Sequence, residues 1–500
     1  MSFDFILQLF AVSFGYWWII WLGILLGIVV GILPGFSPQN TLIMLLPLTV
    51  KVPPEQAMAF MVALYCANHL AGGVPAILVK IPGSGGAAAT TLDGYPMTQK
   101  GQGQQAIVLS FTASVFGGLI TSIATLALLP WLSKLGLYLR SVEMVVVMLF
   151  GLTLIAVIAA KDTLKGLIAG LFGLLIGVIG TDHIYNEPRA TFGFLELYDG
   201  VPLAPALIGL FAISEALVMI EEKMIVSREG RAQAMASNWA ATVEGLRMTV
   251  QNWWHIVWTA FVGLFIGIVP GAGASIAAFV AYQQSRMWSK TPELYGTGIP
   301  QGVIAPEAAN NGVTSGTLVP MMALGVPGGS TAAVMMIVLQ YQGMVMGPRL
   351  FTSNPGLAYG VFVSMVVAYI FMILTILPMA RYMSRIVLFE TSYIAPIIIL
   401  VTCVAAFAER QYLFDMSLAL GFGVLGYIAH KTGYHVTALL IGVILGPLFE
   451  QYVVRALRLS EGDPLILFSS TLGNVLWGFL VLSLVLPPLR QRMQRKKVRS

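Results

Sequence analysis

The segment GIVVGILPG at residues 27–35 recurs as GLFIGIVPG at residues 263–271, 236 positions further along the chain. A second pair, KIPGSGGAAA at residues 80–89 and GVPGGSTAAV at residues 325–334, is separated by 245 positions. Each of these four segments places a Pro-Gly pair inside an apolar stretch. Two landmarks in the same order, at nearly the same spacing, predict that the chain consists of two repeats.

The composition predicts a membrane protein made of helices. Of the 500 residues, 57% are hydrophobic and only 10% are charged, against roughly 25% charged in an ordinary soluble domain. The mean hydropathy is +0.85. A soluble fold would have to expose large apolar patches to carry this composition. It therefore excludes a cytosolic enzyme, a disordered protein and a nucleic-acid binder, and favours an all-α polytopic fold.

Apolar stretches follow one another along almost the whole chain, and we expect about 12–14 membrane segments. Some of these are expected to be broken or re-entrant helices, because four apolar stretches are rich in Gly and Pro. Those four stretches are 34–50, 81–95, 270–285 and 326–346. The expected full spans are 14–33, 55–80, 105–130, 141–160, 163–180, 201–221, 253–269, 303–325, 355–380, 393–407, 414–429, 436–450 and 466–488.

Charge and polarity divide the chain into four parts. The net charge is +5, which we attribute to the preference of cytoplasmic loops for Lys and Arg rather than to an anionic partner. The expected parts are a first membrane repeat at 1–221, a cytoplasmic linker at 222–250, a second membrane repeat at 251–488 and a basic cytoplasmic tail at 489–500.

The positions of the basic residues predict that the two repeats are inverted. With the tail and the linker inside, span 105–130 runs from inside to outside, whereas its partner span 355–380 runs from outside to inside. Lys134 and Arg140, which this scheme places outside, fit it least well. An inverted repeat with helices broken at matching places is typical of a secondary transporter with a site near the bilayer midplane. An ion channel is the alternative, and it explains the duplicated breaks less well.

The broken segments carry the candidate substrate-binding residues. Pro removes a backbone donor and Gly allows close backbone approach, so a Pro-Gly pair interrupts a helix. The half-helix after the break then presents free N–H groups and the positive end of its dipole to an anion. The candidates are Pro34, Gly35, Phe36, Ser37, Gly83, Ser84, Gly85, Gly86, Gly271, Ala272, Gly273, Ser275, Gly328, Gly329, Ser330 and Thr331.

Glycines at these segments also have a purely structural interpretation. They recur at every fourth position from Gly23 to Gly35 and from Gly263 to Gly271. Such ladders bring helices close together without any ligand. We therefore assign the ladders to helix packing and the residues after each break to ligand or ion binding.

Polar residues before the second break of each half are candidates for ion or substrate coupling. They are Asn68, Glu307, Asn310, Asn311 and Thr314. Amide and hydroxyl oxygens suit Na⁺, so Asn68, Asn310 and Thr314 are candidate Na⁺ ligands. A lone carboxylate inside a membrane is costly, which indicates a function for Glu307, although a helix cap at the interface remains the alternative. His69 is expected to be a neutral hydrogen-bonded histidine, and Asp93 to lie in a turn.

The sequence contains no G-x-x-x-x-G-K-[ST] phosphate loop, no HExxH motif and no cluster of metal ligands. GSGG at 83–86 is not followed by Lys, so it is not a phosphate loop. We therefore expect no catalytic residues and no cofactor. The energy for transport would come from a Na⁺ or H⁺ gradient or from a separate partner.

Several motifs together resemble the large membrane subunit of the tripartite tricarboxylate transporters. The resemblance covers nearly the whole chain, in order. The motifs are GILPGFSPQNTLIMLLPLT, IPGSGGAAATTLDGYPMTQKGQ, TFGFLELYDGVPLAPALIGLFAISE, GIVPGAGASIAAFVAYQQS, IAPEAANNGVTSGTLVPMMALGVPGGSTAAV and GYHVTALLIGVILGP.

The resemblance implies a tripartite importer of citrate or related carboxylates, driven by Na⁺ or H⁺. This chain would be its translocation subunit in the bacterial inner membrane, with a cytoplasmic C-terminus. The implied partners are a small membrane subunit of about four helices and a periplasmic solute-binding protein, and a homo-oligomer is possible. An elevator movement of the Pro-Gly hairpins is our mechanistic hypothesis. The competing function is a membrane receptor or scaffold that senses the loaded binding protein without transporting.

Overall fold

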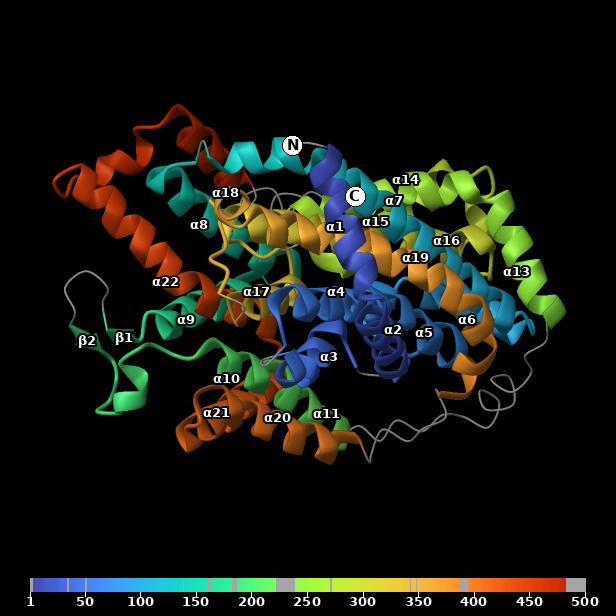
Figure 1. Ribbon diagram of the computed structural model, residues 1–500, viewed down its shortest axis with the longest axis horizontal. Helices are drawn as coiled ribbons and strands as arrows, with labels where there is room; N and C mark the ends of the chain where they lie inside the picture. Colours follow the sequence, from blue (N-terminus) through green and yellow to red (C-terminus); the bar gives the residue numbers. More distant parts are fainter. Residues whose placement is uncertain are drawn as a thin grey trace, which may run out of the picture.

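The computed structural model of the chain is a bundle of helices of very different lengths (Figure 1). It describes residues 3–33, 36–49, 52–137, 139–159, 163–181, 187–221, 239–269, 272–341, 343–347, 349–386 and 394–482. Pro34, Gly35 and Gly271, residues 222–238 of the expected linker and the basic tail lie outside the described residues.

The first half of the chain is helical apart from one two-residue strand pair, within the described part. Its elements are α1 (Phe3–Gly15), α2 (Trp17–Gly31), α3 (Pro38–Leu45), η1 (Leu46–Thr49), α4 (Pro54–Ala71), α5 (Gly73–Val79), η2 (Gly85–Ala87), α6 (Thr91–Gln99), α7 (Gly103–Leu137), α8 (Ser141–Ala159), α9 (Thr163–Gly177), β1 (Gly180–Thr181), β2 (Pro188–Arg189), η3 (Leu195–Leu197), α10 (Leu203–Leu207), the π-helical η4 (Ile208–Ile213) and α11 (Ser214–Glu221).

The regular elements of the second half are all helices within its described residues. Its elements are α13 (Trp239–Gln251), α14 (Trp253–Ile268), α15 (Gly273–Trp288), η5 (Pro292–Leu294), α16 (Pro300–Leu324), α17 (Ser330–Tyr341), α18 (Leu350–Ser353), α19 (Pro355–Ile386), α20 (Ile394–Arg410), α21 (Leu413–Thr432), α22 (Val436–Leu459), η7 (Pro464–Phe468) and a last apolar helix at Thr471–Leu482.

Length and composition identify the membrane helices. Among the described residues, six helices are long and apolar enough to cross a membrane, and the pair α1–α2, bent by 66°, raises this to seven. Shorter apolar helices accompany them. The six are Pro54–Val79, Gly103–Leu132, Leu203–Glu221, Pro355–Thr375, Leu413–Thr432 and Val436–Leu459. The prediction of an all-α polytopic membrane protein is confirmed.

The two halves share backbone geometry at their second breaks. The amide of Ile81 donates to the carbonyl of Pro75 at 3.3 Å, and the amide of Val326 donates to the carbonyl of Pro320 at the same distance. Ile81 and Val326 differ by 245 positions, as do Pro75 and Pro320, which is the offset found in the sequence. The C-caps of α5 and α16, one residue before Ile81 and Val326, are both left-handed.

The ends of the helices that precede the first breaks make matching contacts as well. A Cβ on Gly83 would lie 3.0 Å from the carbonyl oxygen of Gly31, and a Cβ on Gly328 would lie 3.0 Å from that of Gly267. Gly31 and Gly267 differ by 236 positions, and Gly83 and Gly328 by 245. The second break of each half therefore packs against the end of the helix that precedes the first break. This shared packing supports the prediction of two repeats.

The halves are also interlocked. A Cβ on Gly85 would collide with Ser275 Oγ, while Thr331 Oγ1 donates to Gln39 Oε1 at 3.3 Å. Ser275 is the repeat equivalent of Gln39. The segment after the first break of each half thus contacts the second break of the other half, as a two-fold relation between the halves requires.

The glycine ladders pack helices. A Cβ on Gly27 of α2 would lie 2.7 Å from the carbonyl oxygen of Leu64 in α4, and one on Gly267 of α14 would lie 2.9 Å from that of Val313 in α16. These close backbone approaches need small residues.

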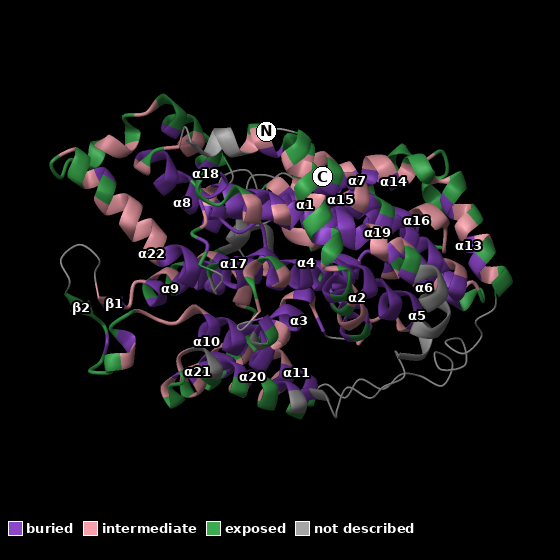
Figure 2. Cartoon of the chain, viewed as in Figure 1, coloured by how far each residue is buried: buried purple, intermediate pink, exposed green. Residues whose placement is uncertain are grey.

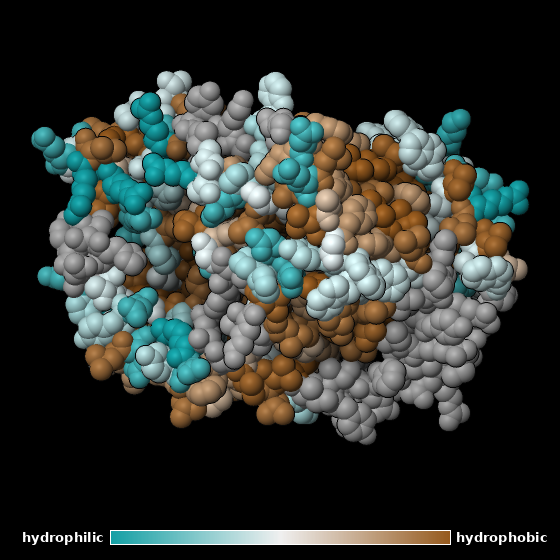
Figure 3. Space-filling view, viewed as in Figure 1, coloured by the Kyte–Doolittle hydropathy of each residue, from teal (hydrophilic) through white to brown (hydrophobic). Residues whose placement is uncertain are grey.

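The helices form two groups. The central group contains α2, α4, α7, α14, α16 and α19, and the flanking group contains α9, α10, η4, α20, α21 and α22, while α3 and α17 contact both groups. Burial differs between individual helices (Figure 2): 94% of the apolar window of Pro54–Val79 in the central group is buried, against 33% for Leu413–Thr432 in the flanking group, although Leu203–Glu221 of the flanking group reaches 78%. Hydrophobic side chains cover broad areas at the centre and right of one face (Figure 3), as expected of a surface in contact with lipid.

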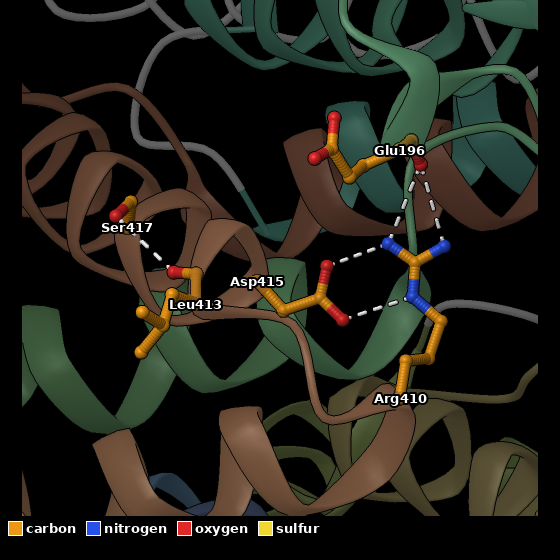
Figure 4. A network of polar contacts seen from close by, with 5 residues as sticks. All are labelled: Glu196, Arg410, Leu413, Asp415 and Ser417. Atoms are coloured by element: carbon orange, nitrogen blue, oxygen red, sulfur yellow. Dashed lines mark hydrogen bonds and ion pairs between the residues drawn. The ribbon is translucent and has the colours of Figure 1, made fainter.

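A bidentate ion pair fixes the connection between α20 and α21 (Figure 4). Arg410 Nε donates to Asp415 Oδ2 at 2.9 Å and Nη2 donates to Oδ1 at 2.5 Å. The same guanidinium lies 3.4 Å from the carbonyl oxygen of Glu196, in η3. The pair therefore joins the flanking helices of the second half to a loop of the first half.

Asp93 forms a tertiary anchor. It lies in the first turn of α6, fully buried, and not in a separate turn as expected. Its carboxylate accepts the amides of Gly296, Gly298 and Ile299 and the hydroxyl of Tyr282 at 2.7–3.1 Å. These bonds hold the loop before α16 against α6.

Candidate functional site

The candidate site is a cavity of about 570 Å³ where the interrupted segments meet. This volume is typical of small-molecule sites. Its lining residues are Pro38, Gln39, Tyr65, His69, Ser84, Gly85, Gly86, Ala272, Gly273, Ala274, Ser275, Ile276, Val313, Thr317, Gly329, Ser330, Thr331, Ala332, His430, His435 and Thr437. All four interrupted segments contribute.

Many of the predicted substrate-binding residues line this cavity together, although they come from distant parts of the sequence. They are Ser84, Gly85, Gly86, Ala272, Gly273, Ser275, Gly329, Ser330 and Thr331. The others that the structure describes lie behind the wall: Phe36 is buried in the apolar core, Ser37 precedes α3, and Gly83 and Gly328 pack against the ends of α2 and α14.

Helix starts point their free amides at the same region. α15 begins at Gly273 and α17 begins at Ser330, both of which line the cavity. α3 begins at Pro38, where the missing N–H is no loss because first-turn amides have no intrahelical partner. Amides and hydroxyls at three helix N-termini favour an anionic ligand.

His69 is held in one orientation at the cavity wall. Asn310 Nδ2 donates a hydrogen bond to the backbone oxygen of His69 at 3.0 Å. Asn310 Oδ1 therefore faces His69 Nδ1 at 3.1 Å and accepts a hydrogen bond from the N–H group there. Nε2 then carries the lone pair of a neutral imidazole, and it has no hydrogen-bond partner among the described residues. This agrees with the expected neutral histidine.

Asn311 and Thr314 connect α16 to α19 instead of facing the cavity. Thr314 Oγ1 donates to the carbonyl of Asn311 at 2.7 Å and lies 3.0 Å from the hydroxyl of Tyr369. That hydroxyl is 3.3 Å from Asn311 Oδ1. These contacts position α16, whose other side lines the cavity through Val313 and Thr317.

Glu307 lies within α16 and is completely buried. Thr90 Oγ1 donates to its Oε1 at 2.5 Å and Ser114 Oγ donates to its Oε2 at 3.0 Å. It sits two turns into the helix, so it does not cap the N-terminus of α16. Among the described residues it makes no salt bridge, and it is not in the cavity lining.

Several lining residues were not predicted, among them Tyr65, His430, His435 and Thr437. His435 lies in the motif GYHVTALLIGVILGP, but no spacing rule in the sequence connects it with the breaks more than a hundred residues away. Burial lowers the pKa of the His435 imidazole below its usual value. Its Nδ1 is buried and has no hydrogen-bond partner among the described residues.

No site for a transition metal accompanies the cavity. Across the described ranges, no three His, Cys, Asp or Glu side chains come together in a metal-binding arrangement. Lys and Arg do not occur among the residues that line it. A ligand would therefore meet hydroxyls, backbone amides and imidazoles.

Interrupted helices around a polar cavity define a class of multi-pass membrane transport proteins. The chain belongs to the tripartite tricarboxylate transporter TctA family, whose sequence profile matches residues 18–441. It is a transporter component and not a member of an enzyme family. The tripartite organisation implies a small membrane subunit and a periplasmic binding protein as partners.

Two relatives come from Agrobacterium vitis. The "uncharacterized 52.8 kDa protein in TAR-I ttuC' 3'region" is 28% identical over 462 residues, covering 92% of this chain and 91% of the relative. The "uncharacterized protein in TAR-II ttuC' 3'region" is 28% identical over 233 residues, covering 46% of this chain and 96% of the relative. No solved structure matches the chain.

Proposed function

We propose that this chain is the translocation subunit of a tripartite importer that carries tricarboxylates, citrate among them, or related carboxylates. The substrate would cross the bacterial inner membrane. A Na⁺ or H⁺ gradient would drive the transport, which would depend on a periplasmic binding protein. The observation that carries the proposal is the cavity of about 570 Å³ that receives residues from all four interrupted segments.

The chemistry of the lining supports a carboxylate as substrate. Carboxylate oxygens accept hydrogen bonds, and the cavity offers donors from Ser275, Ser330 and Thr331 and from the first turns of α15 and α17. Hydrogen bonds to a charged group are stronger than those between neutral groups. We assign substrate contact to these residues and to Ser84, Gly85, Gly86, Gly273 and Gly329, and coupling roles to Asn68, Glu307, Asn310, Asn311 and Thr314.

The remaining parts of the proposal concern organisation. The small membrane subunit would have about four helices, the C-terminus would be cytoplasmic, and the repeats would be inverted. Residues 239–250 of the linker belong to α13, which packs on α7 through a 2.7 Å contact between Thr249 Oγ1 and Thr112 Oγ1. A homo-oligomer is a further possibility.

Reconstituted transport tests the proposal. The chain and its small partner would be placed in proteoliposomes, and uptake of radiolabelled citrate measured with and without binding protein under an imposed Na⁺ or H⁺ gradient. We expect saturable accumulation that needs the binding protein and one gradient. Binding of the loaded binding protein without uptake of any di- or tricarboxylate would instead favour a receptor, and non-saturable flux would favour a channel.

A further inference from the structure

Four buried side-chain oxygens around the first interrupted segment have no hydrogen-bond partner among the described residues. They are Ser37 Oγ, Asn40 Oδ1, Asn68 Oδ1 and Ser84 Oγ. The side chains of Asn40, Asn68 and Ser84 are 7%, 1% and 7% exposed. An unpaired buried polar group destabilises the folded protein. Several at one place therefore indicate a ligand that the oxygens share.

The orientation of Asn68 follows from its neighbours. The hydroxyl of Thr41 donates to the carbonyl oxygen of Ser37 at 3.2 Å. Thr41 Oγ1 must then accept the 2.7 Å hydrogen bond from Asn68 Nδ2. The amide of Asn68 is thereby fixed with its oxygen, and not its NH₂ group, left without a partner.

Close contacts bring Ser84 to the same end of α2 as Asn68, while Ser37 and Asn40 lie at the start of α3. Ser84 Oγ would lie 3.1 Å from a Cβ on Gly72, one helical turn after Asn68, and the amide of Gly83 donates to the carbonyl of Gly72 at 3.1 Å. The carbonyl oxygen of Gly31, the last residue of α2, faces Gly83. Backbone and side-chain oxygens therefore gather around this break.

The second half lacks all four side-chain oxygens. Offsets of 236 and 245 place residues without a side-chain oxygen opposite Ser37, Asn40, Asn68 and Ser84. These equivalents are Gly273, Ile276, Val313 and Gly329. Since the backbone contacts at Gly83 and Gly328 are alike, the fold does not require these oxygens. Their presence in one half alone indicates a function of that half.

We propose that these oxygens form a single binding site for a monovalent hard cation, with Na⁺ as the ion tested below. Hard cations take oxygen ligands from side-chain amides, hydroxyls and backbone carbonyls. The four side chains are neutral, so they suit one positive charge better than two. Asn310 and Thr314, the other expected ligands, are not part of this site, because their oxygens take part in hydrogen bonds with His69, Asn311 and Tyr369.

The site explains how an anion enters a cavity without Lys or Arg in its lining. Ser84 belongs both to the cation site and to the cavity, so a bound cation lies beside the substrate. A cation at this position would attract an anionic substrate, because opposite charges interact more strongly inside a protein than in water. This coupling role rests on the proposed transport function, whereas cation binding itself does not.

Equilibrium binding of ²²Na⁺ tests the site without transport. The full chain with its small partner, in nanodiscs and without carboxylate or binding protein, would be titrated with NaCl, with choline chloride holding the ionic strength. We expect saturable binding that Asn68→Val and Ser84→Gly each weaken at least about tenfold, or 1.4 kcal/mol. Both variants carry the residue that the second half already holds at the equivalent position.

Ser122→Ala is the matched control, because Ser122 Oγ is also buried and without a partner in the described part of the chain but lies on α7. It should bind ²²Na⁺ like the unmodified protein. If Asn68→Val fails to fold, Ser84→Gly alone decides. The proposed site would be rejected if the unmodified protein showed no saturable binding, or if both variants bound ²²Na⁺ as tightly as the unmodified protein. It would also be rejected if Ser122→Ala weakened binding as much as the two variants do. Intact binding without uptake would reject the proposed transport function and leave the site standing.

Discussion

At the scale of single residues, buried charge is handled in two different ways. Asp415 is completely buried and meets a guanidinium, whereas Glu307 is equally buried and meets only hydroxyls. The first arrangement fixes a connection between helices. The second leaves a carboxyl group whose protonation can change without breaking an ion pair, which is why Glu307 remains a coupling candidate.

Arg410→Met should strongly destabilise the protein. It leaves the Asp415 carboxylate buried and unpaired, which costs about 3–5 kcal/mol when one partner of a buried pair is removed. Arg247→Met is the control: its pair with Glu244 is exposed and 3.9 Å long, and such pairs contribute about 0–1 kcal/mol. Thermal unfolding of the two purified variants measures the difference. Equal melting temperatures would contradict the structural role of Arg410.

Contacts between residues that are far apart in the sequence could not be predicted from the sequence. Asn68, Asn310 and Glu307 were found because polar groups stand out in apolar helices. Their partners were not, because Thr90 and Glu307 are separated by 217 positions and His69 and Asn310 by 241. Asp93 was assigned to a turn for the same reason: the loop it holds lies 203–206 positions away.

At the scale of elements, the Pro-Gly breaks matter because the broken segments of one half contact those of the other half. The 3₁₀ turn η2 packs on α15, and α17 packs on α3. Periodicity and composition predicted the breaks and their pairing by offset. They did not predict these contacts between the halves, because nothing local in the sequence indicates which half a broken segment will contact.

Gly86→Ala should disturb a contact between the two halves. A Cβ on Gly86 would collide with the Asn310 amide oxygen that holds His69. Overpacking of this kind costs about 1–3 kcal/mol, so we expect a lower melting temperature and loss of citrate uptake. Gly421→Ala, within α21 and with nothing within 4 Å of its Cβ, should leave both unchanged or raise stability slightly. Normal uptake by Gly86→Ala would argue against this segment as part of the path.

At the scale of the whole molecule, the cavity receives residues from both helix groups. His430, His435 and Thr437 come from α21, α22 and the turn between them, and the other lining residues come from the central group, α3, α15, α17 and the broken segments. Transport by an elevator movement, our mechanistic hypothesis, would slide these groups past each other. The contacts of α17 with α22 and of α3 with η4 are where such sliding would occur.

A disulfide between α17 and α22 should stop transport if the groups move. Cys66 and Cys403, the free cysteines of the described chain, would first be replaced, and one cysteine then placed on each helix. We expect oxidation to abolish uptake and reduction to restore it. A disulfide between α9 and α22, both in the flanking group, should leave uptake unchanged. Full uptake with the α17–α22 link quantitatively formed would reject the elevator hypothesis.

The interlocking of the halves has a consequence for biogenesis. Gln39 of the first broken segment and Thr331 meet across 292 residues, and ribosomes add about 5–20 residues per second. The first broken segment therefore waits roughly 15 to 60 s in the membrane before its partner is synthesised. During that interval its polar backbone lacks native contacts, which hydrocarbon does not tolerate. Insertion of this chain should accordingly depend on an insertase or chaperone that shelters the first half until the second arrives.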